Sequence, residues 1–159
     1  MTPAEVRALW DAGRHDEHYA AACELVAEHP DSADAQLEAA YAHDHLGKER
    51  DAIRYYDAAY QLGVAPDRRR HFLVGYGSTL RNVGRAEDAV GVLGQAIADD
   101  PTYAPFTAFL ALALLDAGHP RLAVATMLGC ALDVAKDGAF DRYRRALTAY
   151  QTLLLEPPQ

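Results

Sequence analysis

The sequence predicts an all-α fold built from repeated helix–turn–helix units. Alanine and leucine dominate the 159-residue chain and β-branched residues are few, a composition that favours helices over strands. Glycines recur at Gly13, Gly47, Gly84 and Gly118, with spacings of 34, 37 and 34 residues. A period of this length is typical of a solenoid in which each repeat is one pair of helices.

Each glycine opens a similar short segment, and each part of the segment has a physical reason. The segments are Gly47–Ala52, Gly84–Ala89 and Gly118–Ala123, whereas His18 stands at the closing alanine position of the first repeat. Glycine ends a helix by adopting a left-handed backbone. Acidic residues near the start of the next helix interact favourably with its positive end, and alanine lets two antiparallel helices approach closely.

The period places four pairs of helices, which we expect to form one domain over residues 1–159. Residues 2–5 read as a capping box with Pro3 at the first helical position, and later helices end near Pro30, Pro66 and Pro101. The expected repeats are approximately 1–30, 31–66, 67–101 and 102–135. The expected helices are 3–12 and 15–28, 33–46 and 49–62, 67–83 and 86–99, and 103–117 and 120–135.

A last helix is expected over residues 139–155. One stripe of this helix is apolar, with members Phe140, Tyr143, Leu147, Tyr150 and Leu154. The open end of a helical stack needs an amphipathic cap, so we interpret this segment as a capping helix. The tail 156–159 is expected to fray.

These repeats resemble the tetratricopeptide repeat (TPR) family, whose repeat is a helix–turn–helix of about 34 residues. The resemblance covers essentially the whole chain, and Tyr76–Arg85 is similar to segments of small, stand-alone bacterial TPR proteins. It implies a right-handed α–α superhelix that binds other proteins and has no catalytic activity. The family's tryptophan early in the first helix is replaced by Gln36, Leu73 and Thr107 here.

The resemblance also implies a peptide-binding groove, because one face of each first helix lines the concave side in this family. The positions carried over to this chain are Leu37, Glu38, Tyr41, Asp44, His45, His71, Val74, Ser78, Arg81, Asn82, Phe109 and Leu112, with Arg7, Trp10 and Asp11 in the first repeat. Binding through an edge or the convex face is the alternative. The carboxylate clamp of chaperone-binding members is not expected, because Arg7 is the one strong donor at its positions and Glu38 would repel a carboxylate.

The charge distribution indicates the class of partner. The net charge is −8, and residues 1–64 hold 13 acidic and 5 basic residues. Such an excess argues against nucleic acid or an anionic membrane and favours a protein or peptide with a basic segment. No apolar run reaches the roughly 20 residues of a membrane span, and no signal peptide is recognisable, so a cytoplasmic protein is expected.

No pattern for catalysis or for a cofactor is found, so an enzyme is not expected. The pairs His15/His18 and His43/His45 lack a third ligand, so no metal site is expected, and His43 falls at a helix-packing position. Cys23 and Cys130 are interpreted as small interior residues. The run 68–71, Arg-Arg-Arg-His, is either a solvated surface or a contact for an acidic partner.

Three classes of function therefore stay open: an adaptor or scaffold, a self-associating homodimer, and a non-catalytic accessory subunit of an enzyme. Gly91 and Gly94 bear on the second class, because both lie on the predicted outer side of one helix. Glycine inside a helix costs up to about 1 kcal/mol relative to alanine. Either the surface tolerates them or another backbone approaches closely there.

Overall fold

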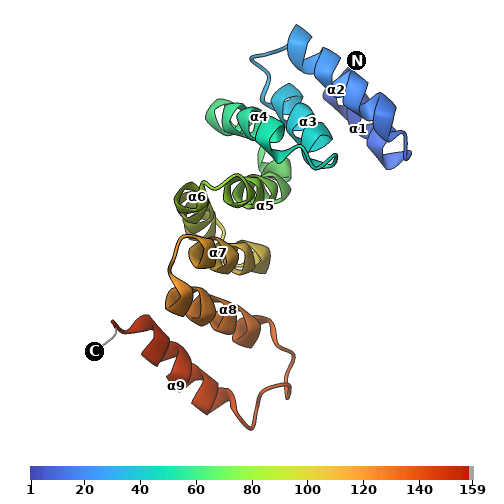
Figure 1. The fold of residues 1–159 in the computed structure, drawn as a ribbon. Helices are drawn as coiled ribbons and strands as arrows, with labels where there is room; N and C mark the ends of the chain where they lie inside the picture. The colour runs from blue at the N-terminus through green and yellow to red at the C-terminus, as the bar shows by residue number, and fades with distance from the viewer. Residues whose placement is uncertain (158–159) are drawn as a thin grey trace. The chain divides into compact units, whose positions relative to one another are not determined.

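The protein is described by a computed structural model covering residues 1–157, and all regular secondary structure within them is helical (Figure 1). The helices are α1 (Pro3–Asp11), α2 (His15–Glu28), α3 (Ala33–Asp44), α4 (Glu49–Leu62), α5 (Pro66–Asn82), α6 (Ala86–Asp99), α7 (Ala104–Asp116), α8 (Pro120–Val134) and α9 (Arg144–Leu155). The helices α1 to α8 begin and end within two residues of the predicted bounds. The chain divides into two compact units, Met1–Phe72 and Leu73 onward, so α5 contributes to both.

The turns between paired helices follow from the repeat glycines. Gly47 and Gly84 have φ values of 69° and 88°, and Gly13 and Gly118 adopt the same left-handed backbone. No non-glycine residue among those described has a positive φ. The capping box at the start of α1 is also present, since the Thr2 amide donates to the Glu5 carboxylate over 2.7 Å and Thr2 Oγ1 accepts from the Glu5 amide.

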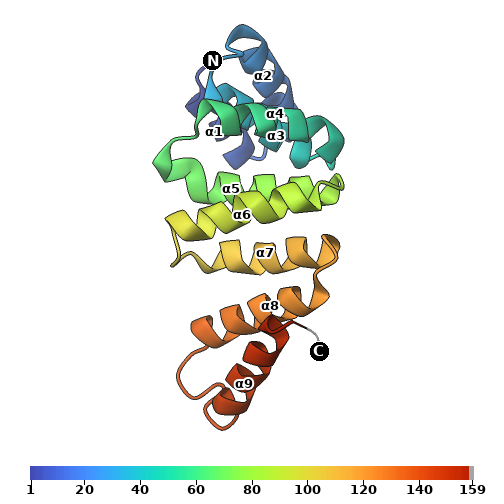
Figure 2. The same ribbon diagram turned by 90° about the vertical axis from the view of Figure 1, so that its left-hand side faces the viewer.

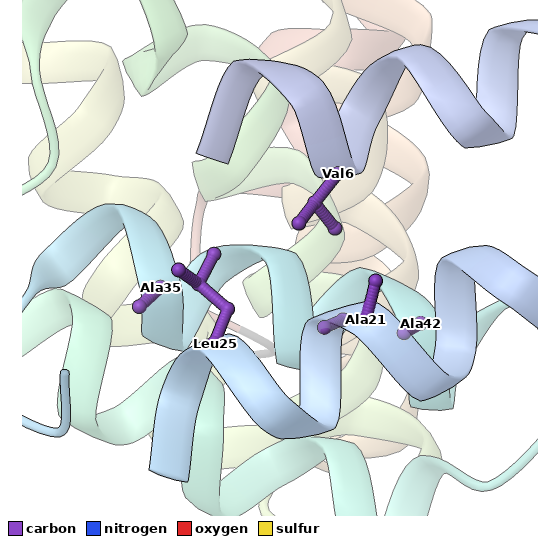
Figure 3. Packing of buried hydrophobic residues seen from close by; sticks show 6 residues of the cluster. Val6, Ala21, Leu25, Ala35 and Ala42 are labelled. Atoms are coloured by element: carbon purple, nitrogen blue, oxygen red, sulfur yellow. The ribbon is translucent and has the colours of Figure 1, made fainter. Parts of the chain in front are cut away.

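The core of the first unit is built from small side chains between α1, α2 and α3 (Figure 3). Its buried members are Val6, Ala21, Ala22, Leu25, Ala35 and Ala42. Alanines at these positions let the helices approach closely, while Val6 and Leu25 fill the space that remains. In α4, Ala52, Tyr56 and Ala59 are fully buried at the positions that the repeat pattern predicts.

The second unit shows the same packing in α6. Ala89 and Leu93 are fully buried and Ala96 is 2% exposed. Leu93 packs against Gly77 of α5, where an added Cβ would lie 2.8 Å from the leucine side chain. The helix pairs α6–α7, α7–α8 and α8–α9 are in contact.

The last helix differs from its prediction. It begins at Arg144 instead of residue 139, because residues 137–143 form turns in which Gly138 has a left-handed backbone (φ 88°). The predicted stripe is also only partly buried: Tyr143 and Tyr150 are 59% and 61% exposed, whereas Phe140, Leu147 and Leu154 are half-buried. The C-terminal tail that was expected to fray lies partly outside the described residues.

The helix α9 is nevertheless fastened to α8, and the two lie side by side in both views (Figures 1 and 2). Gln151 Nε2 donates to the carbonyl of Ala125 over 3.3 Å, and Arg144 donates to the carbonyl of Leu132 over 3.0 Å. Within residues 1–157, no helix is both long and apolar enough to cross a membrane.

Candidate functional site

The first unit carries a pocket of about 290 Å³ on the side formed by α1, α3 and the start of α5. It is lined by Arg7, Trp10, Asp11, His18, Glu38, Tyr41, His45 and His71. All of these except His18 belong to the first helices of their repeats or directly follow one. The pocket therefore brings together Glu38, Tyr41, His45 and His71 of the predicted groove set.

The floor of the pocket is a buried ion-pair network centred on Glu38. This residue is 1% exposed, and its Oε1 lies 2.6 Å from Nη2 of Arg7 and 2.6 Å from Nη2 of Arg68. Arg68 also reaches Asp34, with Nη1 2.6 Å from Oδ1. These residues stand on α1, α3 and α5 about one repeat apart in sequence, so equivalent turns of successive first helices meet at the carboxylate.

The network changes the interpretation of Glu38 and of the basic run at the start of α5. Burial raises the pKa of the Glu38 carboxyl to about 7, and Arg7 acts in the opposite direction by favouring the ionised form. Since two guanidinium groups already contact this carboxylate, it is not an open contact for a basic ligand. Arg68 likewise does not belong to a solvated surface, because its side chain is 13% exposed and paired within its own chain.

The wall of the pocket is a row of rings. Trp10 stacks on His45 with ring centroids 3.7 Å apart and an interplanar angle of 21°, and His15 lies 4.1 Å away. Tyr41 continues the row between His45, at 6.1 Å, and His71, at 5.2 Å. Trp10 is the single tryptophan of the chain, so its fluorescence reports on this site.

Burial also determines the charge of two pocket imidazoles. It lowers the pKa of His18, with the nearby His45, His15 and Arg7 adding to the effect, and it lowers the pKa of His45. Both rings are therefore neutral at pH 7. The pocket therefore offers aromatic faces and the neutral imidazoles of His18 and His45, beside the side chains of Arg7 and Asp11.

Other residues of the predicted set lie in different surroundings. Leu37 is fully buried and does not line the pocket. Asp44 accepts a hydrogen bond from Tyr56 Oη over 2.9 Å. In the second unit, Arg81 Nε lies 2.6 Å from Oδ2 of Asp116. Val74, Ser78 and Phe109 are half-buried there, while Asn82 and Leu112 are exposed.

Sequence reasoning missed the role of Arg68 and the position of His18 in the pocket. A signal for Arg68 was present, because Asp34 and Arg68 are opposite charges separated by 34 residues, one repeat length. Arg81 and Asp116 repeat this arrangement with a separation of 35 residues. Opposite charges one repeat apart on first helices thus mark contacts between neighbouring repeats.

His43 lies in the core, as its position in the repeat predicts. It is 5% exposed, its Nδ1 lies 2.8 Å from the Ala39 carbonyl, and its Nε2 lies 3.4 Å from Tyr19 Oη. In the part of the chain that the structure describes, no group of three or more His, Cys, Asp or Glu side chains is arranged to hold a metal ion. Cys23 and Cys130 are free thiols and are half-buried, less enclosed than predicted.

The chain was also compared with known proteins. No curated protein sequence matches it significantly. A family model described as tetratrico peptide repeat matches residues 33–154, from the start of α3 to the last turn of α9. Because this match takes in more than half of the chain and the helices follow the same period, the protein belongs to the tetratricopeptide repeat family.

Proposed function

We propose that this protein is an adaptor that binds a segment of another protein, and that the pocket of the first unit receives one anchoring side chain of that segment. Repeats of this family generally mediate interactions between proteins. The observation that carries the proposal is the pocket of about 290 Å³, lined almost entirely by first-helix positions. A concave site with aromatic walls and a few polar groups is the usual form of a specific binding site.

The chemistry of the pocket indicates how an anchor is held. Neutral rings supply apolar contact area, and aromatic residues are enriched among the residues that dominate binding energy. The acidic excess of residues 1–64 favours basic residues in the ligand on either side of the anchor. Asp11 lines the pocket and is exposed. We therefore propose that Asp11, and not the buried Glu38, contacts the basic residues of the ligand.

The proposal is tested with peptides selected from a random display library against the whole protein. Their dissociation constants are then measured for the wild type and for His71→Trp, in which a larger ring occupies the edge of the pocket. His29→Trp is the matched control, because His29 is exposed and does not line the pocket. We expect binding to weaken at least tenfold in His71→Trp and to be unchanged in the control. If both variants bind the peptides equally well, the binding site is not the pocket.

The charge of the ligand is tested separately. Reversal at Glu38 is unsuitable because a lysine there would face Arg7 and Arg68 in the core. Asp11→Lys should instead weaken the binding of selected basic peptides and reduce its dependence on salt. Asp16→Lys makes the same change of charge on an exposed residue outside the pocket. If both variants lose affinity equally, a general field and not the pocket attracts the peptide.

A further inference from the structure

The helix α9 does not take the place that the next first helix would occupy in a regular repeat. It contacts α8 through the side chains or backbone of Arg121, Ala125, Gly129 and Leu132. The preceding second helix, α6, has the same register 34 residues earlier. Its four equivalent residues, Glu87, Gly91, Gln95 and Ala98, are all exposed. Thus α9 packs on the side of α8 that faces solvent in α6.

A different side of α8 is consequently left open. We define the open face as Val124, Met127, Ala131 and Val134, and its three large residues are 55%, 39% and 59% exposed. Their equivalents 34 residues earlier are less exposed: Leu93 of α6 is fully buried, and Val90, Ile97 and the C-cap residue Asp100 are half-buried. Leu93 packs against Gly77 of α5, and α6 as a whole contacts α7. The comparison indicates that the open face is shaped to receive a helix.

The open face is also complementary to itself. Its members are spaced by three, four and three residues, a pattern that reads the same in both directions along the helix. In an antiparallel pair of α8 helices, Val124 meets Val134 of the second copy, and Met127 meets the small Ala131. Large residues packing against small ones is the usual geometry of close helix pairs.

The charges of α8 favour the same arrangement. Arg121 near the start and Asp133 near the end are the two charged residues of the helix, and the opposite charges of Lys136 and Asp137 follow it. Antiparallel pairing brings the basic end of one copy near the acidic end of the other. Two chains of net charge −8 repel each other. Because the middle of α8 carries no charge, two copies can approach there with little local repulsion.

We propose that the protein forms a two-fold symmetric dimer through the open face of α8, with the two helices antiparallel. This surface is separate from the pocket and independent of the proposed function. One helix pair is a small interface, so the association is weak and depends on concentration. A closed two-fold contact uses the same patch on both copies, which the symmetric spacing of the open face allows.

The test begins with the mass of the whole protein in solution, measured by sedimentation equilibrium over a series of concentrations. The wild type should pass from monomer to dimer, and Val124→Glu should weaken the dimer at least tenfold. Leu153→Glu is the matched control, because Leu153 on α9 is 54% exposed, close to the 55% of Val124, and lies outside the open face. Circular dichroism and thermal melts check that each variant is folded.

A second variant tests the antiparallel arrangement itself. Val124→Glu combined with Val134→Lys should restore the dimer, because the glutamate of one copy then faces the lysine of the other. Within one chain these positions are ten residues, about 15 Å, apart along the helix, so they do not pair with each other. A wild type that is monomeric at every concentration would overturn the proposal. So would equal dissociation in the Leu153→Glu control, or a double variant that stays monomeric.

Discussion

Replacing Gly77 by alanine should destabilise the protein although alanine is the better helix former. Gly77 lies inside α5, and an added Cβ would meet Cγ and Cδ1 of Leu93 at 2.8 Å and Cδ2 at 2.9 Å. Carbon atoms pack at about 3.5–4.0 Å, so the helices or the leucine must move. Leu93 is fully buried and cannot turn into solvent. Gly91 in α6 offers the matched control, because its added Cβ would meet nothing within 4 Å.

The expected magnitude follows from two opposing effects. Alanine in place of glycine inside a helix stabilises by up to about 1 kcal/mol at either position. Overpacking at a tight core contact costs about 1–3 kcal/mol and applies to Gly77 alone. Gly77→Ala should therefore be neutral to about 2 kcal/mol less stable, while Gly91→Ala should be up to about 1 kcal/mol more stable. In a chain of this size, 1 kcal/mol corresponds to about 2–4 °C in melting temperature.

Urea denaturation followed by circular dichroism measures both changes. Leu93→Ala should by itself lower the free energy of unfolding by about 2–5 kcal/mol. It also removes the leucine atoms that the Cβ added by Gly77→Ala would contact too closely. In that background Gly77→Ala should become neutral or stabilising, so the two substitutions are not additive. If Gly77→Ala stabilises the wild type as much as Gly91→Ala does, the close contact between α5 and α6 is wrong.

Further predictions concern packing, pH and the outer surface. Ala89→Leu and Ala52→Leu should each cost about 1–3 kcal/mol in a chemical melt, because both alanines are fully buried, and a melt equal to the wild type would show a wrong register. Burial lowers the pKa of His18, so the unfolded chain takes up a proton first as the pH falls below 6.5. Stability should decline from pH 6.5 toward the lower folded-state pKa, and His18→Gln should reduce that decline in urea melts at pH 5 and pH 7.5. Gly91→Ala with Gly94→Ala should raise the melting temperature without changing the mass in solution, because both added Cβ atoms would lie in open space; a weaker dimer would instead place the interface on α6.

The local signals in the sequence were sufficient for most of the helical architecture. A left-handed glycine at Gly47 or Gly84 ends a helix wherever the rest of the chain lies, and the capping box at Thr2 is satisfied within four residues. The buried alanines were predictable for a related reason: repeats pack on their neighbours, so the period itself marks the contact positions. The late start of α9 is the main error, and it arose where a loop interrupts the period.

Only the tertiary structure shows which side chains of different helices pair with each other and which helix faces are covered. Helical periodicity places Glu38 on the face of α3 assigned to the groove, but it does not reveal that Arg7 and Arg68, 31 and 30 residues away, converge on the carboxylate. It likewise marks α9 as amphipathic without specifying which side of α8 it covers. The physical reason is the same in both cases. Backbone preferences and caps act over a few residues. Burial and charge pairing instead depend on which distant helix packs against a given position in the folded chain.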